Sequence, residues 1–404
     1  EVTESSVGFT AGIQSNQITP QGGRVAYELV YTNDGRGYNE TSGVFKAPKS
    51  GLYLFIIAGL NQVSKGFLFD LYRNENYMIS SYTSSVIDRE NSANPTVVRL
   101  VTGDRVYVKA RFRSSVTGTQ GDVYATFTGI LVGQLEPEAS AVGFTAGFIS
   151  EKTIPPRGRV AYEQTFTNEG RGYNATSGVF TAPKGGLYLF IIAALNQVNK
   201  PFLFDLYRNE DFMITLFGGQ AARTSSANGI SLRLIKGDRV YVQTRFAASG
   251  VFGSPKDVYT TFTGILVGTS DYRDGNVGFT AGFKNHQIIR AGGRVAYDQV
   301  FTNDGNGYNA ISGVFTAPKA GLYLFFISEL NQPNKLFLFD LYHNDDYMIS
   351  SFGSRPTGHV SAANDVVLRL ERGDTVYVGS RVLSSVFGTE IDVYATFTGV
   401  LVGI

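Results

Sequence analysis

The chain contains no cysteine, and it has three histidines among its 404 residues. Without cysteine there is neither a disulfide framework nor a cysteine nucleophile. This absence leaves the compartment open, because a secreted domain of this size can fold without disulfides and a cytosolic one needs none. His286, His343 and His359 all lie in the last third of the chain, and we interpret them as exposed polar residues rather than a catalytic or zinc site. The sequence therefore predicts a protein that is not an enzyme.

The chain also lacks an excess of either charge. Its 35 basic and 34 acidic side chains leave a net charge of +1, which argues against binding of nucleic acid or acidic lipid by bulk electrostatics. No apolar run reaches the length of a membrane span, and the stretch Glu1–Ser6 is mostly polar, so neither a transmembrane helix nor a signal peptide is expected within this sequence. We therefore expect no nucleic-acid partner and no membrane span.

What the sequence does contain is glycine and aromatic residues in a threefold repeat. There are 47 Gly, 30 Phe and 23 Tyr, a composition that favours strands joined by glycine-bearing turns. The hexapeptide Val7–Gly12 recurs at Val142–Gly147 and Val277–Gly282, with a period of 135 residues. This period predicts one domain per repeat. The expected division is domain 1 at 1–133, a linker at 134–141, domain 2 at 142–268, a linker at 269–276 and domain 3 at 277–404.

The repeat is closest in Ser177–Gln197, which has copies at Ser42–Gln62 and Ser312–Gln332. The second half of this stretch, Leu187–Leu195, is an apolar run that predicts a strand. A strand with one face in water should alternate polar and apolar residues, but this run is apolar on both faces. We therefore expect its outer face to be covered by another copy of the module, with three modules packed around a shared axis.

Turn signals every 8–12 residues divide each repeat into ten or so short strands, which predicts an all-β sandwich such as a jelly roll. Within repeat one, Val97–Val101 and Val106–Phe112 are predicted to form a hairpin across the turn at Gly103-Asp104. The polar segment Ser81–Pro95 differs in sequence from its two counterparts, and such drift indicates an exposed loop. The counterparts are Leu216–Gly229 and Ser351–Asp365.

An aspartate recurs inside an otherwise apolar strand of each repeat, at Asp70, Asp205 and Asp340. A carboxylate in such a setting usually has a partner, and the arginines of the strand after the Gly-Asp turn are suitable. A structural ion pair is the favoured interpretation, and a ligand site is the alternative. The three arginines are Arg111, Arg245 and Arg381.

The loop Asn33–Tyr38 and its copies Asn168–Tyr173 and Asn303–Tyr308 combine an amide, a carboxylate, a guanidinium and an aromatic ring. These groups suit a sugar site, which needs hydrogen bonds to hydroxyls and a ring to stack on. Turn formation explains the Asn, Asp and Gly equally well. In repeat three the arginine is replaced by Asn306. The candidate ligand-binding residues of these loops are Asp34, Arg36, Tyr38, Arg171, Tyr173 and Tyr308.

Each repeat carries the same series of motifs in the same order. In repeat one they are Val7-Gly8-Phe9-Thr10-Ala11, Asn33-Asp34-Gly35, Ser42-Gly43-Val44-Phe45, Gly51-Leu52-Tyr53-Leu54-Phe55, Leu71-Tyr72-Arg73-Asn74, Gly103-Asp104-Arg105-Val106-Tyr107-Val108 and Thr126-Phe127-Thr128-Gly129-Ile130-Leu131. This series resembles the C1q globular head domain of the C1q/TNF superfamily, and the resemblance covers all three repeats. It implies a ten-stranded jelly roll whose normal unit is a compact trimer of three chains.

The chain departs from most of that family because it has no collagen-like repeat and carries three modules in one chain. A threefold ring closes after three copies, so we expect a monomeric chain that acts as a single-chain pseudo-trimer. An eight-residue linker can span at most about 26–29 Å. That length is enough to pass from the end of one module to the start of its neighbour.

Some members of the family hold calcium near the top of the trimer axis. The matching loops here end in Lys65, Lys200 and Lys335 and contain no carboxylate, whereas calcium prefers several; no metal or other cofactor is therefore expected. If the family's geometry applies, these three lysines converge near the axis. They then either splay into water or form an anion site suited to a sialic-acid carboxylate or a sulfate.

In function, the sequence most resembles the secreted invertebrate C1q-domain lectins of innate immunity. The resemblance implies a secreted, calcium-independent protein whose partners are glycans or glycoproteins, including microbial or sialylated glycans. The alternatives are a structural or adhesive extracellular-matrix protein that cross-links its partners, and a TNF-like receptor ligand. The glycosylation acceptors Asn39-Glu40-Thr41 and Asn174-Ala175-Thr176 favour secretion.

Overall fold

The computed structural model describes residues 6–83, 89–119, 122–134, 141–219, 223–245, 248–269, 276–354, 358–389 and 392–403. These residues form strands and turns, with no helix, and hence none long and apolar enough to cross a membrane. The predicted linkers lie mostly outside the described residues. The strands fall into three consecutive sets, which we call module 1 (β1 to β14), module 2 (β15 to β26) and module 3 (β27 to β38).

Module 1 contains β1 (Gly8–Gly12), β2 (Gln17–Thr19), β3 (Leu29–Asp34), β4 (Tyr38–Asn39), β5 (Val44–Lys46), β6 (Gly51–Leu60), β7 (Phe67–Arg73), β8 (Asn76–Thr83), β9 (Asn91–Leu100), β10 (Arg105–Ala110), β11 (Ser114–Val116), β12 (Gly118–Thr119), β13 (Asp122–Val123) and β14 (Thr126–Gln134). Module 2 contains β15 (Gly143–Gly147), β16 (Lys152–Ile154), β17 (Gln164–Glu169), β18 (Tyr173–Asn174), β19 (Val179–Thr181), β20 (Gly186–Leu195), β21 (Phe202–Arg208), β22 (Asp211–Gly218), β23 (Ser225–Leu234), β24 (Arg239–Thr244), β25 (Ser249–Val251) and β26 (Thr261–Thr269). Module 3 contains β27 (Gly278–Gly282), β28 (Gln287–Ile289), β29 (Gln299–Asp304), β30 (Tyr308–Asn309), β31 (Val314–Thr316), β32 (Gly321–Leu330), β33 (Leu336–His343), β34 (Asp346–Ser354), β35 (Ser361–Leu370), β36 (Thr375–Ser380), β37 (Ser384–Val386) and β38 (Thr396–Gly403).

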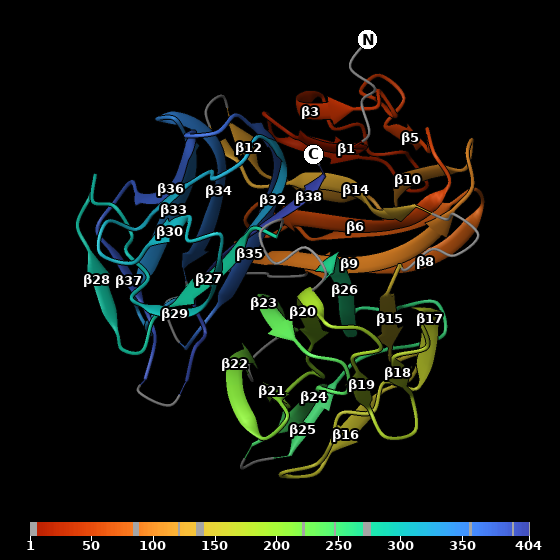
Figure 1. Ribbon diagram of the computed structural model, residues 1–404. Helices are drawn as coiled ribbons and strands as arrows, with labels where there is room; N and C mark the ends of the chain where they lie inside the picture. Colours follow the sequence, from red (N-terminus) through yellow and green to blue (C-terminus); the bar gives the residue numbers. More distant parts are fainter. Residues whose placement is uncertain are drawn as a thin grey trace.

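Each module is a sandwich of two five-stranded antiparallel sheets. In module 1 the inner sheet has the order β3-β1-β14-β6-β9 and the outer sheet has the order β4-β5-β10-β7-β8. The corresponding strands of modules 2 and 3 pair in the same order. The ten-stranded jelly roll that the sequence predicts is confirmed in all three repeats, and the three modules lie around a common centre (Figure 1).

The long apolar strand of each inner sheet is buried along its whole length. Because successive side chains of a strand point to opposite faces, β20 contributes to two cores. Tyr188 and Phe190 lie in the core between the sheets of module 2, whereas Leu189 and Ile191 join a core that all three modules share. The covering of both faces, predicted from the sequence, is therefore confirmed. This axial core includes Leu52, Leu54, Ile56, Leu187, Leu189, Ile191, Leu322, Leu324 and Phe326.

The modules form a closed ring in which the edge strand of each inner sheet lies against the inner sheet of the next module. β9 contacts module 2, β23 contacts module 3 and β35 contacts module 1. At each interface a threonine hydroxyl accepts a backbone N–H of the edge strand. The three N to Oγ1 distances are 2.7 Å from Val97 to Thr145, 2.8 Å from Ser231 to Thr280 and 2.8 Å from Val367 to Thr10. Head-to-tail contacts of this kind close only when the rotation fits the number of copies, and here three copies suffice.

Two local predictions are corrected by the structure. β9 and β10 do not form a hairpin, because β9 belongs to the inner sheet and β10 to the outer sheet; the turn at Gly103, where φ is 94°, carries the chain from one sheet to the other. Of the predicted loop Ser81–Pro95, residues 84–88 lie outside the described residues, and most of the rest is strand, since β8 extends to Thr83 and β9 begins at Asn91. The same holds for Leu216–Gly229 and Ser351–Asp365. Among the polar residues of Ser81–Pro95 that the structure describes, Ser92 and Asn94 are buried and hydrogen-bond to module 2.

Each module ends beside the start of the next one. A methyl group built on Gly133, at the end of module 1, would lie 2.7 Å from Cβ of Ala141. Gly268 has the same relation to Asn276, whose side chain would contact such a methyl group. At the third junction, a methyl group built on Gly403 would lie 2.6 Å from Cβ of Ser6. The end of module 3 therefore lies beside the start of module 1, just as the ends of modules 1 and 2 lie beside the starts of modules 2 and 3.

Candidate functional site

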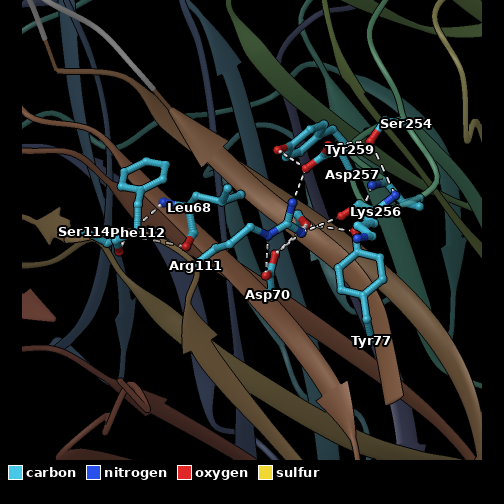
Figure 2. A network of polar contacts seen from close by, with 12 residues as sticks. Leu68, Asp70, Tyr77, Arg111, Phe112, Ser114, Ser254, Lys256, Asp257 and Tyr259 are labelled. Carbon is cyan, nitrogen blue, oxygen red and sulfur yellow. Dashed lines mark hydrogen bonds and ion pairs between the residues drawn. The ribbon is translucent and has the colours of Figure 1, made fainter. Parts of the chain in front are cut away.

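The aspartate inside the apolar strand β7 forms an ion pair rather than an open site. Arg111 Nε lies 2.7 Å from Oδ2 of Asp70, and its Nη2 lies 2.8 Å from Oδ1. The guanidinium also contacts the carboxylate of Asp257 in module 2 (Figure 2). Asp70 is almost completely buried and accepts a further hydrogen bond from Ser80. The predicted structural pair is confirmed, and in addition it joins two modules.

The same arrangement recurs at the other two interfaces. Arg245 contacts Asp205 in its own module and Asp392 in module 3, and Arg381 contacts Asp340 and, in module 1, Asp122. Burial disfavours the charged guanidinium, but the carboxylates outweigh it and hold the pKa of each of these arginines above its usual value. Asp70, Asp205 and Asp340 are buried, and both carboxylate oxygens of each accept hydrogen bonds from protein, which leaves these three aspartates unavailable to a ligand.

The structure places the three loop tyrosines inside the module cores. Tyr38 stacks on Phe9 with ring centroids 4.7 Å apart, and its hydroxyl donates to the carbonyl of Tyr27 at 3.0 Å. Tyr173 and Tyr308 make the equivalent contacts and are also buried. These rings cannot stack on a sugar without leaving the core. Tyr38, Tyr173 and Tyr308 are therefore corrected from ligand-binding to core residues.

The remaining groups of the loops divide into partnered and exposed ones. Asp34 binds Arg369 of module 3, whose Nε lies 2.7 Å from Oδ2. The side chain of Asn33 holds the loop by bonding the backbone of Tyr38. Arg36 is exposed and has a φ of 50°. Turn formation thus accounts for the amide, and an interface pair accounts for the carboxylate, while the arginine is left facing solvent.

Module 2 presents its arginine in the same way, and module 3 has an amide there. Arg171 has a φ of 53° and is exposed. Asn306 also has a φ of 53°, in the left-handed region that Asn tolerates better than most residues. The exposed end of the loop therefore carries a cation in two modules and a neutral amide in the third.

Lys65, Lys200 and Lys335 lie in exposed loops after the long apolar strands. Lys65 Nζ donates to Oε1 of Gln62 in the same loop at 3.2 Å. Lys200 Nζ donates to Oγ1 of Thr153 at 3.3 Å, on the short strand β16 that pairs with β25 rather than with the inner sheet. Each of these two contacts stays within its own module. An anion site shared by the three lysines stays a prediction.

No group of three or more His, Cys, Asp or Glu side chains able to hold a metal occurs in the described part of the chain. His343 pairs with Asp374 at 3.0 Å, at the place where module 1 has the Arg73–Asp104 pair. His359 bonds the carbonyl of Asn331 at 2.8 Å. His343 and His359 are half-buried, whereas His286 is exposed as expected.

Sequence reasoning missed the polar residues that join the modules. Asn94 on β9 accepts from the Thr261 hydroxyl of module 2 at 2.7 Å and donates to the carbonyl of Val258. Asn228 and Asn364 make equivalent bonds at the other interfaces. Because buried polar groups need partners, these asparagines fix how the modules meet. Their repetition at the same place in each repeat was the available signal.

Comparison with known proteins gives one family over nearly the whole chain. A model of the C1q domain matches residues 8–132, 143–267 and 278–402. Among similar proteins, Caprin-2 of Danio rerio is 34% identical over 112 residues, which are 27% of this chain and 12% of that protein. Human complement C1q tumor necrosis factor-related protein 2 is 32% identical over 84 residues, which are 21% of this chain and 29% of that protein. The matches thus span less than a third of either relative.

Among solved structures, the globular domain of the zebrafish complement 1qA protein resembles one module of this chain. The match has 16% sequence identity and a TM-score of 0.27, and it covers 31% of this chain and 97% of that chain.

Proposed function

This chain belongs to the C1q domain family, and from that premise we propose that it is a secreted binding protein whose ligands are glycans or glycoproteins. We place recognition on the exposed loops and not in the module cores or interfaces, because a saccharide cannot reach groups that are buried there. Binding, rather than catalysis, is the activity proposed.

The observation that carries this proposal is the closed ring of three related but different modules. The ring presents each exposed loop three times, in three chemical versions. The loop reads Asp34-Gly35-Arg36 in module 1, Glu169-Gly170-Arg171 in module 2 and Asp304-Gly305-Asn306 in module 3. Guanidinium and amide groups in exposed turns suit hydrogen bonding to sugar hydroxyls and carboxylates. Several weak sites on one rigid body raise the avidity for a multivalent surface.

An extracellular location is supported by the two glycosylation acceptors. Asn39 and Asn174 are both exposed, as attachment of a glycan requires. In module 3 the corresponding triplet ends in Ile311, which is 94% exposed and cannot serve as the hydroxyl residue. Protein made in secreting eukaryotic cells should therefore lose the mass of two glycans on treatment with an amidase that releases N-linked chains. Unchanged mass would count against the secretory location.

A glycan array with the full chain tests the proposed ligand class. We expect binding to a defined set of saccharides. A parallel array with Lys65, Lys200 and Lys335 all changed to Gln tests the lysines, and one with Arg36 and Arg171 changed to Gln tests the loops. Loss of binding to sialylated glycans only in the lysine variant would support the shared anion site. Absence of any saccharide binding, together with binding to matrix proteins, would favour the adhesive alternative over a lectin.

A further inference from the structure

Each outer sheet carries two stacked tyrosines on neighbouring strands. In module 1 they are Tyr72 of β7 and Tyr107 of β10, with ring centroids 5.8 Å apart. The distance is 5.5 Å for the pair of module 2 and 5.2 Å for Tyr342 and Tyr377 of module 3. The electron-rich faces of such rings attract cations. The three modules therefore share one aromatic platform, and they differ in what lies on it.

In module 1 the platform is occupied by the chain's own lysine. Lys109 Nζ lies 5.2 Å from the centroid of Tyr72 and 5.3 Å from that of Tyr107. The carboxylate of Glu75 lies 3.7 Å from the same ammonium group, and the guanidinium of Arg24 lies 4.7 Å from the Tyr107 ring. Together with its neighbours, Lys109 covers Tyr107, whose exposed fraction is 1%. The platform thus holds an alkylammonium group next to an arginine.

Module 3 retains the two stacked tyrosines but has no lysine over them. Gly379 takes the place of Lys109, and Thr375 takes the place of Arg105. A carboxylate is retained, since Asp345 corresponds to Glu75 and accepts a hydrogen bond from the Tyr377 hydroxyl at 2.7 Å. Tyr377 is no longer fully buried. Module 3 therefore lacks both the lysine that lies over the rings and the arginine that pairs with Glu75 in module 1, while the rings and the carboxylate remain.

A pocket of about 330 Å³ lies at this place. It is lined by Gly292, Gly293, Arg294, Tyr342, Tyr377 and Gly379. Arg294 lies 4.3 Å from the Tyr377 ring, as Arg24 does from Tyr107 in module 1 at 4.7 Å, so an arginine at this distance is compatible with an ammonium neighbour. In module 2 the neutral Gln243 stands at the position of Gly379.

We propose that this pocket of module 3 binds an alkylammonium group supplied by another molecule, in the place that Lys109 fills in module 1. The ligand is either a lysine side chain of a protein partner or a small ammonium compound, because both present the same charged group to the two rings. The site is separate from the proposed glycan loops, since it is built on β33 and β36 of the outer sheet.

The test uses the full chain and n-butylammonium, which reproduces the side chain of lysine. Saturation-transfer NMR should detect binding of n-butylammonium, and 1-butanol and butyrate serve as neutral and anionic controls of the same length. Gly379→Lys restores the residue of module 1 and should weaken binding at least about tenfold, the scale of a desolvated cation–π contact. Equal binding of all three probes, or preference for a neutral saccharide over n-butylammonium, would overturn the proposal.

A reciprocal variant keeps the test decisive if Gly379→Lys folds poorly. Lys109→Gly should open a second site in module 1 and double the binding stoichiometry, with a melting curve to confirm folding. An unchanged stoichiometry in the folded Lys109→Gly protein would contradict the proposal. Binding of tetramethylammonium distinguishes the two sources of the ligand. If it binds more strongly than n-butylammonium, a small ammonium compound is favoured. If n-butylammonium binds more strongly, a lysine side chain is favoured.

Discussion

Arg245 shows how much a single side chain contributes to the joining of modules. It is 12% exposed, and it binds Asp205 in its own module and Asp392 in module 3, whose side chains are 1% and 10% exposed. Replacing one partner of a buried pair leaves an uncompensated charge, at a cost of about 3–5 kcal/mol. We therefore expect Arg245→Gln to lower the free energy of unfolding by that amount in urea denaturation. Arg36→Gln, at an exposed arginine, is the control, and an equal effect of both changes would contradict this role.

Glu329 should make the stability of the protein depend on pH. It is fully buried, and burial raises its pKa to about 8, although Ser351 and Tyr297 donate hydrogen bonds to it. Between pH 4.5, the usual value, and about pH 8, the folded protein binds a proton that the unfolded chain has lost. Stability is therefore lost as the pH rises through this window, by on the order of a few kcal/mol.

The measurement is urea denaturation at pH 5, 7 and 9. The wild type should be most stable at pH 5, and Glu329→Gln should flatten the profile. Asp365, whose burial raises its pKa to about 7, acts in the same direction and leaves part of the slope in place. Glu40→Gln, at an exposed glutamate, should not change the profile. A slope that is the same in Glu329→Gln and wild type would show that Glu329 does not titrate in this window.

At the residue scale, the sequence predicted which charged side chains pair with each other better than it predicted which side chains are exposed. The Asp70–Arg111 pair followed from a carboxylate in an apolar strand. The third member, Asp257, could not be predicted, because it lies 146 residues from Arg111 and comes close only when the modules assemble. Tyr38 was mistaken for a ligand residue because a Gly-Tyr turn does not show on which side of the strand the ring lies. The stacking on Phe9 decides that.

At the scale of elements, β20 should be sensitive to charge on its axial face. Ile191 is 1% exposed and lies in the axial core. An aspartate there would be buried without a partner, and we expect Ile191→Asp to destabilise the protein by more than about 4 kcal/mol. Ile288→Asp is a matched control, because Ile288 lies on strand β28 and is 69% exposed. Thermal melting curves should show a steep fall for the first variant only; similar melting temperatures would mean that the axial face of β20 tolerates water.

Strands β20 and β9 also show which elements a sequence pattern can predict and which it cannot. β20 was predictable because apolar residues on both faces are an unusual signal. β9 was mistaken for a loop in its first half because Asn91–Pro95 is polar. Within this stretch, Ser92 and Asn94 hydrogen-bond to Ser225 and Thr261 of module 2. A sequence pattern records which residues are polar, and only the assembled ring shows that protein rather than water hydrogen-bonds to them.

At the scale of the whole molecule, a single module should not stay monomeric. Residues 1–133 carry both sides of each interface contact, for example Asn94 and Thr126, or Arg111 and Asp122. Expressed alone, this segment should form trimers or aggregate, because its axial core would otherwise face water. The 404-residue chain should be monomeric. Light scattering distinguishes the states, and a well-behaved monomer of residues 1–133 would contradict the pseudo-trimer.

The contact between Gly403 and Ser6 has a consequence for the order of the modules. Because this junction matches those at Gly133 and Gly268, the ring has no structurally distinct first module. A circular permutant that joins residue 403 to residue 6 through an eight-residue linker, and is opened between residues 134 and 141, should fold to the same ring. The covalent order of the modules would then be a matter of genetic history, while their cyclic order is fixed by the interfaces.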